Sequence, residues 1–247
     1  MKKVWNILST AIPIAIILFC FLGFLFAPND PSVTDVMNKY QSASAQYPFG
    51  TDNMGRCEFS RILAGGWVTI GIVLAGSAIV AVIGSLVGLL LGQSSTAKNV
   101  LLDSIMNAVT AIPPVAYLII FIGIWGNSIP TMMVSLTASL ILRMIKLVKT
   151  RTEMEMAKAY IMCAVSSGAS RFRILLGHVI PNIGKEIVRF LCLSCAEMIM
   201  AISGFSFIGL TLGDDVIDWG SMLSSARSYL GMAPMLLFYP ILFIFLS

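Results

Sequence analysis

The sequence predicts an all-α polytopic membrane protein with six transmembrane helices, and three observations carry that prediction. Hydrophobic residues make up 57% of the 247 residues and charged residues only 11%. Soluble domains carry roughly a quarter charged residues, so this composition excludes an ordinary soluble domain. Apolar stretches of about 20 residues, long enough to cross a bilayer, recur along the chain. Lysine and arginine residues gather between particular stretches.

Six apolar stretches account for the predicted helices, all within one transmembrane domain that covers residues 1–247. Their approximate bounds are 4–27, 66–92, 100–125, 130–147, 187–210 and 230–247. The first apolar run is too long for a signal peptide, and the FLFAPND that follows offers no small-residue cleavage site. We therefore expect an uncleaved span. The third stretch contains Pro113 and Pro114, which a buried membrane helix tolerates as a kink.

The distribution of basic residues predicts that both termini are cytoplasmic. With the N-terminus inside, twelve of the sixteen basic residues fall on cytoplasmic segments or their helix ends: Lys2, Lys3, Lys98, Arg143, Lys146, Lys149, Arg151, Lys158, Arg171, Arg173, Lys185 and Arg189. The four that fall outside are Lys39, Arg56, Arg61 and Arg227. Seven of the twelve acidic residues also fall outside: Asp30, Asp35, Asp52, Glu58, Asp214, Asp215 and Asp218. The net charge of +4 therefore reflects topology and requires no nucleic-acid partner.

Two kinds of sequence motif bear on enzymatic function, those for ATP hydrolysis and those for redox chemistry. It contains no G-x-x-x-x-G-K-[ST] phosphate loop, so we expect no ATPase activity and no bound cofactor. Cys192 and Cys195 have the C-x-x-C spacing of redox and zinc sites, but they lie inside the fifth predicted span. We expect them to pack there as small residues, because a thiol oxidoreductase would need the pair near an interface. Cys57 lies near the predicted outer face, and its redox state stays open.

The basic segment from 150 to 184, between the fourth and fifth spans, is predicted to form two short helices joined by a hinge. Gly168 supplies the left-handed conformation that ends the first helix, and Ser170 caps the second. The second helix carries one apolar stripe of Phe172, Leu175, Leu176 and Val179. Pro181 is expected to stop it, leaving two pieces too short to cross a bilayer. Such a segment suits helix-in-groove docking to a partner protein or a position on anionic lipid, and both remain open.

Three stretches resemble one family. YIMCAVSSGASRFRILLGHVIPN is similar to the coupling loop of binding-protein-dependent ABC importer permeases, within the dipeptide, oligopeptide and nickel branch, and specifically its second permease subunit. FGTDNMGRCEFSRILAGG resembles the outer signature of that branch. GFSFIGLTLGDDVIDWGSMLSSAR resembles its stretch after the fifth span. The three stretches occur in the family's order and topology and together extend over most of the chain.

The resemblance assigns roles to individual residues. In the coupling loop these are Ala164, Gly168, Ala169, Ser170, Arg171, Arg173, Ile174, His178, Pro181 and Asn182. In the outer signature they are Gly50, Thr51, Asp52, Gly55, Arg56, Ser60 and Arg61, and in the outer loop Asp218, Trp219, Gly220 and Met222. The chain departs from the family at four positions: Cys57, Asn107 and Ala159 replace acidic residues, and Val165 replaces an arginine.

The resemblance also implies a fold, partners and a mechanism. The fold is that of a type I ABC importer permease in the cell membrane of a prokaryote. The partners are a homologous second permease, two ATP-binding subunits that carry ATP-Mg, and an extracytoplasmic solute-binding protein. ATP-driven closure of the ATP-binding subunits would push on the coupling loop and rock the spans between inward-open and outward-open states.

Substrate and pathway are less specified. Glu197 lies in the middle of the fifth predicted span and is a candidate for the translocation path, although an internal hydrogen bond to a neighbouring helix would also explain it. Nickel, a metal chelate and short peptides are all open as substrates. The DWG…AR…FYP run looks slightly more like nickel permeases. A secondary transporter or channel not driven by ATP is the alternative function. We expect no metal site or catalytic residue in this chain.

Overall fold

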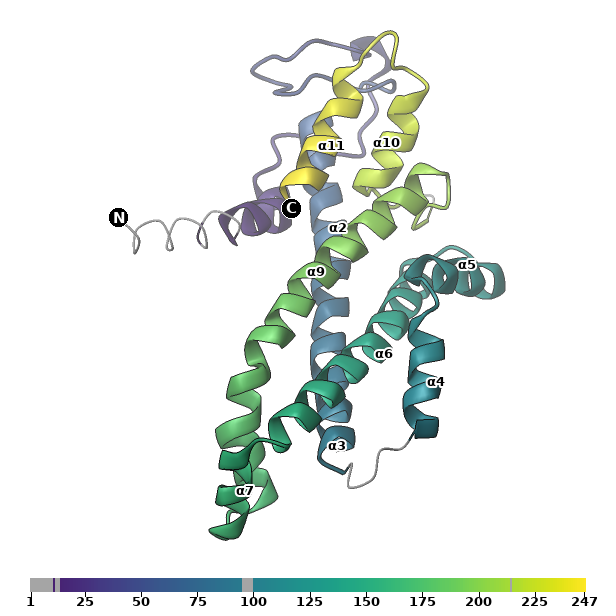
Figure 1. Ribbon diagram of the computed structural model, residues 1–247. Coiled ribbons are helices and arrows are strands. Elements are labelled where there is room, and N and C mark those ends of the chain that lie inside the picture. The colour runs from purple at the N-terminus through teal and green to yellow at the C-terminus, as the bar shows by residue number, and fades with distance from the viewer. Residues whose placement is uncertain (1–10, 12–13, 95–99, 214) are drawn as a thin grey trace. The chain divides into compact units, whose positions relative to one another are not determined.

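The computed structural model of this chain describes residues 11, 14–94, 100–213 and 215–247, and these form helices joined by irregular segments (Figure 1). The all-helical prediction is confirmed: the described residues contain no strand beyond a single bridge between Thr51 and Cys57. Several earlier assignments lie outside the described residues, namely the start of the first span at residue 4 and the sides given to Lys2, Lys3, Lys98 and Asp214.

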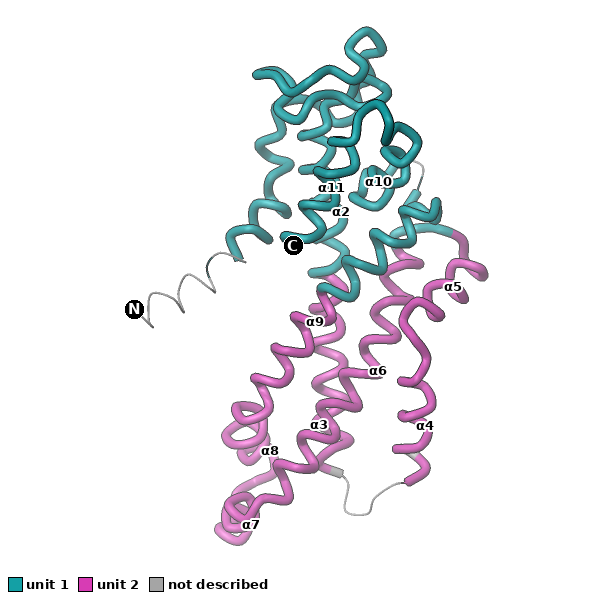
Figure 2. Tube along the Cα trace, turned by 45° about the horizontal axis from the view of Figure 1, so that its top comes forward, with its two compact units in different colours: residues 1–74, 127–129, 196–247 teal, residues 75–126, 130–195 magenta. Residues whose placement is uncertain are grey.

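The chain divides into two compact units (Figure 2). Unit 1 contains residues 1–74, 127–129 and 196–247, and unit 2 contains residues 75–126 and 130–195. The helices are α2 (Glu58–Ile79), α3 (Ser85–Ser94), α4 (Val100–Thr110), α5 (Pro114–Trp125), α6 (Ile129–Met156), α7 (Ala159–Ser166), α8 (Arg171–Ile174), α9 (Ile180–Phe207), α10 (Trp219–Arg227) and α11 (Met235–Leu246).

Three helical runs are long and apolar enough to cross a membrane: Glu58–Gln93, Ile129–Met156 and Arg171–Phe207. A fourth candidate exists if α4 and α5 count as one bent span. Two shorter apolar helices, Ile14–Phe26 and Met235–Leu246, fall below that length. The described residues therefore support a multi-pass membrane protein, while the predicted count of six spans is not confirmed.

The third predicted span is broken rather than kinked. Its two parts, α4 and α5, meet at an angle of 76°. Pro113 adopts ψ 146°, because a residue that precedes proline is pushed out of the helical region, and here Pro114 follows. Two consecutive prolines also remove two backbone donors. The chain therefore leaves the helix after Thr110 and restarts it at Pro114.

Within unit 2, α3 and α6 pack at very short range. Gly84, at the end of a π-helical turn, and Gly88 and Gly92 in α3 are spaced four residues apart on one face. A Cβ atom at these positions would lie 2.5 Å from Met144 Cγ, 2.6 Å from Val148 Cβ and 2.6 Å from Thr152 Cβ, respectively. Small residues at every fourth position allow this approach between membrane helices. None of these three glycines was among the residues predicted to have a role.

Within unit 1, Trp219 is the centre of the packing. Its side chain is fully buried, and its Nε1 donates a hydrogen bond to the carbonyl oxygen of Ile62 over 2.9 Å. Gly65 and Gly66 of α2 leave room for the indole, since a Cβ at either would lie 3.1 Å from a ring carbon. On the other side of α10, a Cβ at Gly220 would lie 2.3 Å from the Ser203 carbonyl oxygen of α9. α2, α9 and α10 therefore fix one another at this tryptophan.

Candidate functional site

The predicted hinge is present. α7 ends at Ser166, and Gly168 adopts φ +80°, the left-handed conformation that glycine favours. The Ala169 N–H donates to the carbonyl oxygen of Ala164 over 3.0 Å, the pattern of a glycine-terminated helix. Ser170 Oγ accepts a hydrogen bond from the Arg173 N–H over 3.4 Å and so caps α8. Arg171 and Arg173 are exposed in this turn.

The prediction that Pro181 stops the second helix is wrong. α8 continues through a π-helical turn, Leu175–Val179, into α9, so helix runs from Arg171 to Phe207. A proline ring clashes with the carbonyl four residues earlier, which here belongs to Gly177 inside the π turn. The wider turn accommodates the proline. The second piece is therefore the beginning of the fifth predicted span and not a separate short helix.

The predicted single apolar stripe is also wrong, because the π turn shifts the side chains that follow it. Ile174 and Val179, five residues apart, are buried. Phe172 is 71% exposed and Leu176 is 50% exposed. In α7, Met162 and Val165 are exposed as well. We call the four exposed side chains, Met162, Val165, Phe172 and Leu176, the coupling surface.

A polar cluster, which we call the Glu155 brace, joins the end of α6, α7 and the start of α9. The Glu155 side chain is buried and accepts hydrogen bonds from Lys158 Nζ (2.7 Å), Asn182 Nδ2 (3.0 Å) and the Tyr160 hydroxyl. Asn182 Nδ2 also donates to the Tyr160 hydroxyl over 2.9 Å. The His178 ring lies edge-on to Tyr160, with 5.8 Å between centroids. The hydrogen bonds to Glu155 raise the pKa of both Tyr160 and Lys158.

Two members of the Glu155 brace, His178 and Asn182, were among the predicted coupling-loop residues, whereas Glu155 and Tyr160 were not. The family's acidic position is Ala159 here, but the structure places a buried carboxylate on the same segment from Glu155, four residues earlier. Glu155 lies in the last turn of α6, which continues past the predicted end of the fourth span at 147. The sequence signal was the acid directly before the hinge segment.

The outer signature folds into a tight turn organised by Asp52. Asp52 Oδ1 accepts from the backbone N–H groups of Met54 (2.8 Å) and Arg56 (2.9 Å), and Oδ2 accepts from Arg56 Nε over 2.7 Å. Arg61 Nε lies 3.6 Å from the same oxygen. Gly55 adopts φ +78°, and a Cβ there would overlap the Asp35 carbonyl oxygen at 1.7 Å. These residues therefore hold the turn in shape through their hydrogen bonds and backbone conformation.

The other members of the outer signature belong to the same turn. The Gln41 N–H donates to Thr51 Oγ1 over 2.8 Å. Gly50 adopts φ +79°, and a Cβ there would lie 2.3 Å from the Gln41 carbonyl oxygen. Ser60 Oγ accepts from the Asn29 N–H over 3.2 Å. These members of the outer signature therefore make their contacts with the segment between Asn29 and Gln41.

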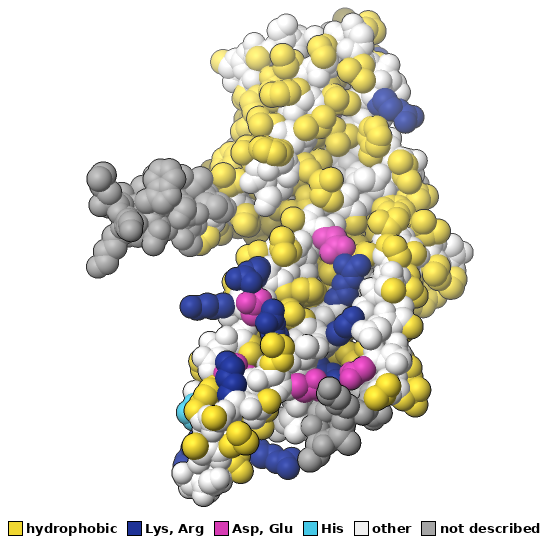
Figure 3. Space-filling view, in the orientation of Figure 1, with side chains coloured by type: hydrophobic (Ala, Val, Ile, Leu, Met, Phe, Trp, Pro, Cys, Tyr) yellow, Lys and Arg dark blue, Asp and Glu magenta, His cyan; other side chains and the backbone are white. Residues whose placement is uncertain are grey.

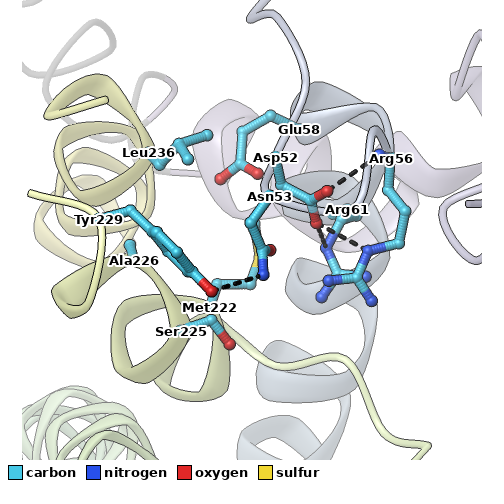
Figure 4. Close-up of a pocket in the computed structure, with 10 residues that line it drawn as sticks. All are labelled: Asp52, Asn53, Arg56, Glu58, Arg61, Met222, Ser225, Ala226, Tyr229 and Leu236. Carbon is cyan, nitrogen blue, oxygen red and sulfur yellow. Dashed lines mark hydrogen bonds and ion pairs between the residues drawn. The ribbon is translucent and has the colours of Figure 1, made fainter. Parts of the chain in front are cut away.

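The outer signature and the residues after Trp219, predicted separately, meet in one pocket of unit 1 (Figure 4). Asn53 Nδ2 donates to the Tyr229 hydroxyl over 3.1 Å across it. Met222 and Leu236 form its apolar side. Glu58, only 3% exposed, lines the pocket, and its carboxylate points to the side opposite Arg56. The volume of about 20 Å³ holds roughly one water molecule, so this pocket, which we call the junction pocket, has no room for a peptide or a metal chelate.

Asp218 fixes the start of α10. Its Oδ2 accepts from the N–H groups of Gly220 (2.9 Å) and Ser221 (3.2 Å), and Ser221 Oγ accepts in turn from the Asp218 N–H over 3.2 Å. Burial raises the pKa of Asp218, while the hydrogen bonds from Ser206, Ser221 and Gly220 act in the opposite direction. Asp218, Trp219, Gly220 and Met222 are all buried, so the predicted outer-loop residues form a packed core.

The remaining candidates are Glu197, Cys192 and Cys195 in α9, and Cys57 directly before α2. Glu197 is partly buried in this helix. Cys195 Sγ lies 3.1 Å from Ser77 Oγ, and Cys192 is exposed. Cys57 is a buried free thiol. In the described part of the chain, no group of three or more His, Cys, Asp or Glu side chains could hold a metal ion.

Comparison with known proteins assigns the family. The model of the binding-protein-dependent transport system inner membrane components matches residues 84–247. The chain belongs to this family. The match takes in the α3–α6 contact, the hinge, the Glu155 brace and α10. As a member, the chain is a membrane permease subunit of an ABC importer and not itself an enzyme.

Individual relatives place this permease in the dipeptide, oligopeptide and nickel branch. The nickel transport system permease protein NikC of Escherichia coli K12 is 26% identical over 98% of the chain and 88% of its own length. The oligopeptide transport system permease protein OppC of Haemophilus influenzae is 26% identical, covering 94% and 75%. The probable D,D-dipeptide permease DdpC of Escherichia coli K12 is 27% identical, covering 92% and 79%.

Proposed function

We propose that this permease forms half of a translocation path and couples ATP hydrolysis on two partner subunits to uptake of nickel, a metal chelate or short peptides. A homologous second permease supplies the other half, and an extracytoplasmic solute-binding protein delivers the substrate. ATP-Mg binds the partner subunits and not this chain. The permease lies in the inner membrane with both termini in the cytoplasm, as the distribution of basic residues favours.

The observation that carries the coupling role is the coupling surface on either side of a glycine hinge. Exposed apolar side chains on two short helical segments suit insertion into a groove of a partner protein. Phe172 and Leu176 are one turn apart, so both reach the same groove. Arg171 and Arg173 beside them add charge for an acidic rim.

The substrate class follows less directly, and nickel is slightly favoured. The NikC relative matches 98% of the chain, and the DWG…AR…FYP run looks more like nickel permeases than like peptide permeases. The relatives named for peptides match almost as well. The junction pocket of unit 1 is too small for a peptide or a metal chelate. Selection therefore falls to the solute-binding protein.

A secondary transporter or channel that needs no ATP is the competing function. Such a protein has no use for a docking segment that binds an ATPase. Purification discriminates between the two functions, because an importer permease brings down ATP-binding subunits and a homologous permease. A chain that transports alone in proteoliposomes, without those subunits, supports the competing function.

The Gly168→Pro variant tests coupling. Proline fixes φ near −65°, far from the observed +80°, and removes the N–H that donates to the Val165 carbonyl oxygen over 3.0 Å. We expect ATP-dependent uptake to be lost while the protein stays in the membrane. Gly177→Ala is the matched control, because no heavy atom lies within 4 Å of a Cβ there. Normal uptake by Gly168→Pro would refute the coupling role.

A further inference from the structure

A second cavity, distinct from the hinge and from the junction pocket, opens on unit 2 between α4, α6 and α9. Its volume is about 610 Å³, and three basic residues line it: Arg143, Lys146 and Arg151. Leu147, Met154 and Phe190 supply an apolar part. Figure 3 shows lysine and arginine side chains over α6 and the neighbouring part of α9, with acidic side chains among them. We call this cavity the basic pocket.

α6 carries the basic pocket on a different face from the one that packs on α3. Met144, Val148 and Thr152 are fully buried against the glycine face of α3. Arg143 directly precedes those positions, Lys146 and Arg151 fall between them, and all three are only partly buried. The short α3–α6 contact therefore fixes the direction in which the basic side chains project.

Two charges of the basic pocket, those of Lys146 and Arg151, are incompletely neutralised by the protein. Lys146 Nζ donates to a neutral partner, Thr110 Oγ1, over 3.3 Å. Arg151 Nη2 lies 3.6 Å from Glu186 Oε2, an oxygen that Arg189 also contacts at 3.0 Å. Lys149, outside the pocket, contrasts with them, since Asp103 (2.6 Å) and Glu153 (2.7 Å) both neutralise it. An anion is therefore the complementary ligand.

The position of the basic pocket along α6 indicates that the ligand also has an apolar part. Arg143 comes 14 residues after the start of the helix at Ile129, and Arg151 eight residues later. At a rise of about 1.5 Å per residue, these side chains leave the helix roughly 21 to 33 Å from its start. The hydrocarbon core is about 30 Å thick, so they cross the boundary between acyl chains and headgroups. A ligand at this depth has a charged head and an apolar tail.

We propose that the basic pocket binds one anionic phospholipid of the leaflet on the lysine- and arginine-rich side. Its phosphodiester group contacts Lys146 and Arg151, which suit a phosphate as a point charge and as a two-pronged donor, respectively. One acyl chain packs on Leu147, Met154 and Phe190. This binding site is separate from the proposed coupling role and holds whichever substrate is carried.

Native mass spectrometry of the importer, purified with its partner subunits and titrated with phosphatidylglycerol, tests the site. Removing one surface charge near anionic lipid weakens binding by about fivefold, so we expect that loss for Lys146→Gln and roughly 30-fold for Lys146→Gln with Arg151→Gln. Lys185→Gln is the matched control, because it removes one exposed lysine of the same unit outside the pocket. Lys146→Arg keeps the charge and should keep the lipid.

Four outcomes would overturn the proposal. Equal retention of phosphatidylglycerol by wild type and by the double variant places the lipid elsewhere. Equal affinity for phosphatidylcholine means that the headgroup charge is not recognised. Displacement of the lipid by millimolar inorganic phosphate assigns the pocket to a free anion, and cross-linking of residue 146 to the second permease in place of lipid assigns it to a protein interface. Size-exclusion profiles of Lys146→Gln and Lys146→Arg separate lost binding from lost folding.

Discussion

Gly88→Ala should destabilise the contact between α3 and α6 although alanine is the better helix former. The added Cβ would lie 2.6 Å from Val148 Cβ, 2.9 Å from the Ile145 carbonyl oxygen and 3.0 Å from Val148 Cγ1. Carbon atoms pack best at about 3.5 to 4.0 Å, so the two helices must separate by roughly 1 Å. Overpacking of this kind costs about 1 to 3 kcal/mol.

Gly123→Ala in α5 is the control that isolates this cost. A Cβ at Gly123 has no heavy atom within 4 Å, so the substitution there should only gain the helix propensity of alanine, about 0.5 to 1 kcal/mol. The same gain is present in Gly88→Ala and cancels in the comparison. The two variants should therefore differ by the full 1 to 3 kcal/mol, or about 2 to 12 °C in melting temperature for a chain of this size.

Thermal unfolding of the purified permease in one detergent measures the difference. A further substitution, Val148→Ala, should not rescue Gly88→Ala, because the blocking atoms are Val148 Cβ and a backbone oxygen, which remain. Equal melting temperatures for Gly88→Ala and Gly123→Ala would refute the close packing. Full rescue by Val148→Ala would refute the assignment of the clash.

Three further predictions concern the Glu155 brace and the buried residues Trp219 and Asp218. Glu155→Gln should speed hydrogen exchange in α7 and reduce uptake per ATP hydrolysed. Lys158→Gln should change little, because the Lys158 side chain is half-exposed. Unchanged hydrogen exchange in Glu155→Gln contradicts the Glu155 brace. Trp219→Phe should cost about 1 to 3 kcal/mol of unfolding free energy, because the Ile62 carbonyl loses its buried donor, and a melting temperature equal to wild type contradicts this. Because the pKa of Asp218 is raised in the folded state, its protonated carboxyl stabilises the fold at pH values below the unfolded pKa near 4, and this contribution is lost as pH rises. The stability of wild type relative to Asp218→Asn should therefore fall from about pH 4 upward. A stability difference that grows with pH contradicts this prediction.

Local chemistry explains why the hinge could be predicted from the sequence. A left-handed glycine and a serine cap are decided by residues within three positions of each other, and Gly168 and Ser170 adopt the expected roles. The π-helical turn before Pro181 could not be predicted in this way. Whether a proline ends a helix depends on the neighbouring carbonyl geometry, and the wide turn at Gly177 removed the conflict.

Other features could not be predicted from the sequence because they depend on residues far apart in the chain. The Glu155 brace depends on Asn182, 27 residues away, and the junction pocket depends on Tyr229, 176 residues from Asn53. The glycine spacing of α3 was readable, since Gly84, Gly88 and Gly92 recur at every fourth position, but its partner face on α6 was not. The third span broke because two prolines acted together, an effect larger than a single kink.

The structure of unit 2 explains how a push on the hinge segment would reach the membrane helices. α7 is tied through Tyr160 to Glu155 at the end of α6, and α9 is tied through Asn182 to the same carboxylate. α6 in turn is locked to α3 by glycines that leave no room for sliding. Close-packed elements move as rigid bodies and not by continuous deformation. If the coupling surface docks a partner as proposed, we expect a force on Phe172 and Leu176 to reach α9 directly along the continuous helix, and to reach α6 through the Glu155 carboxylate.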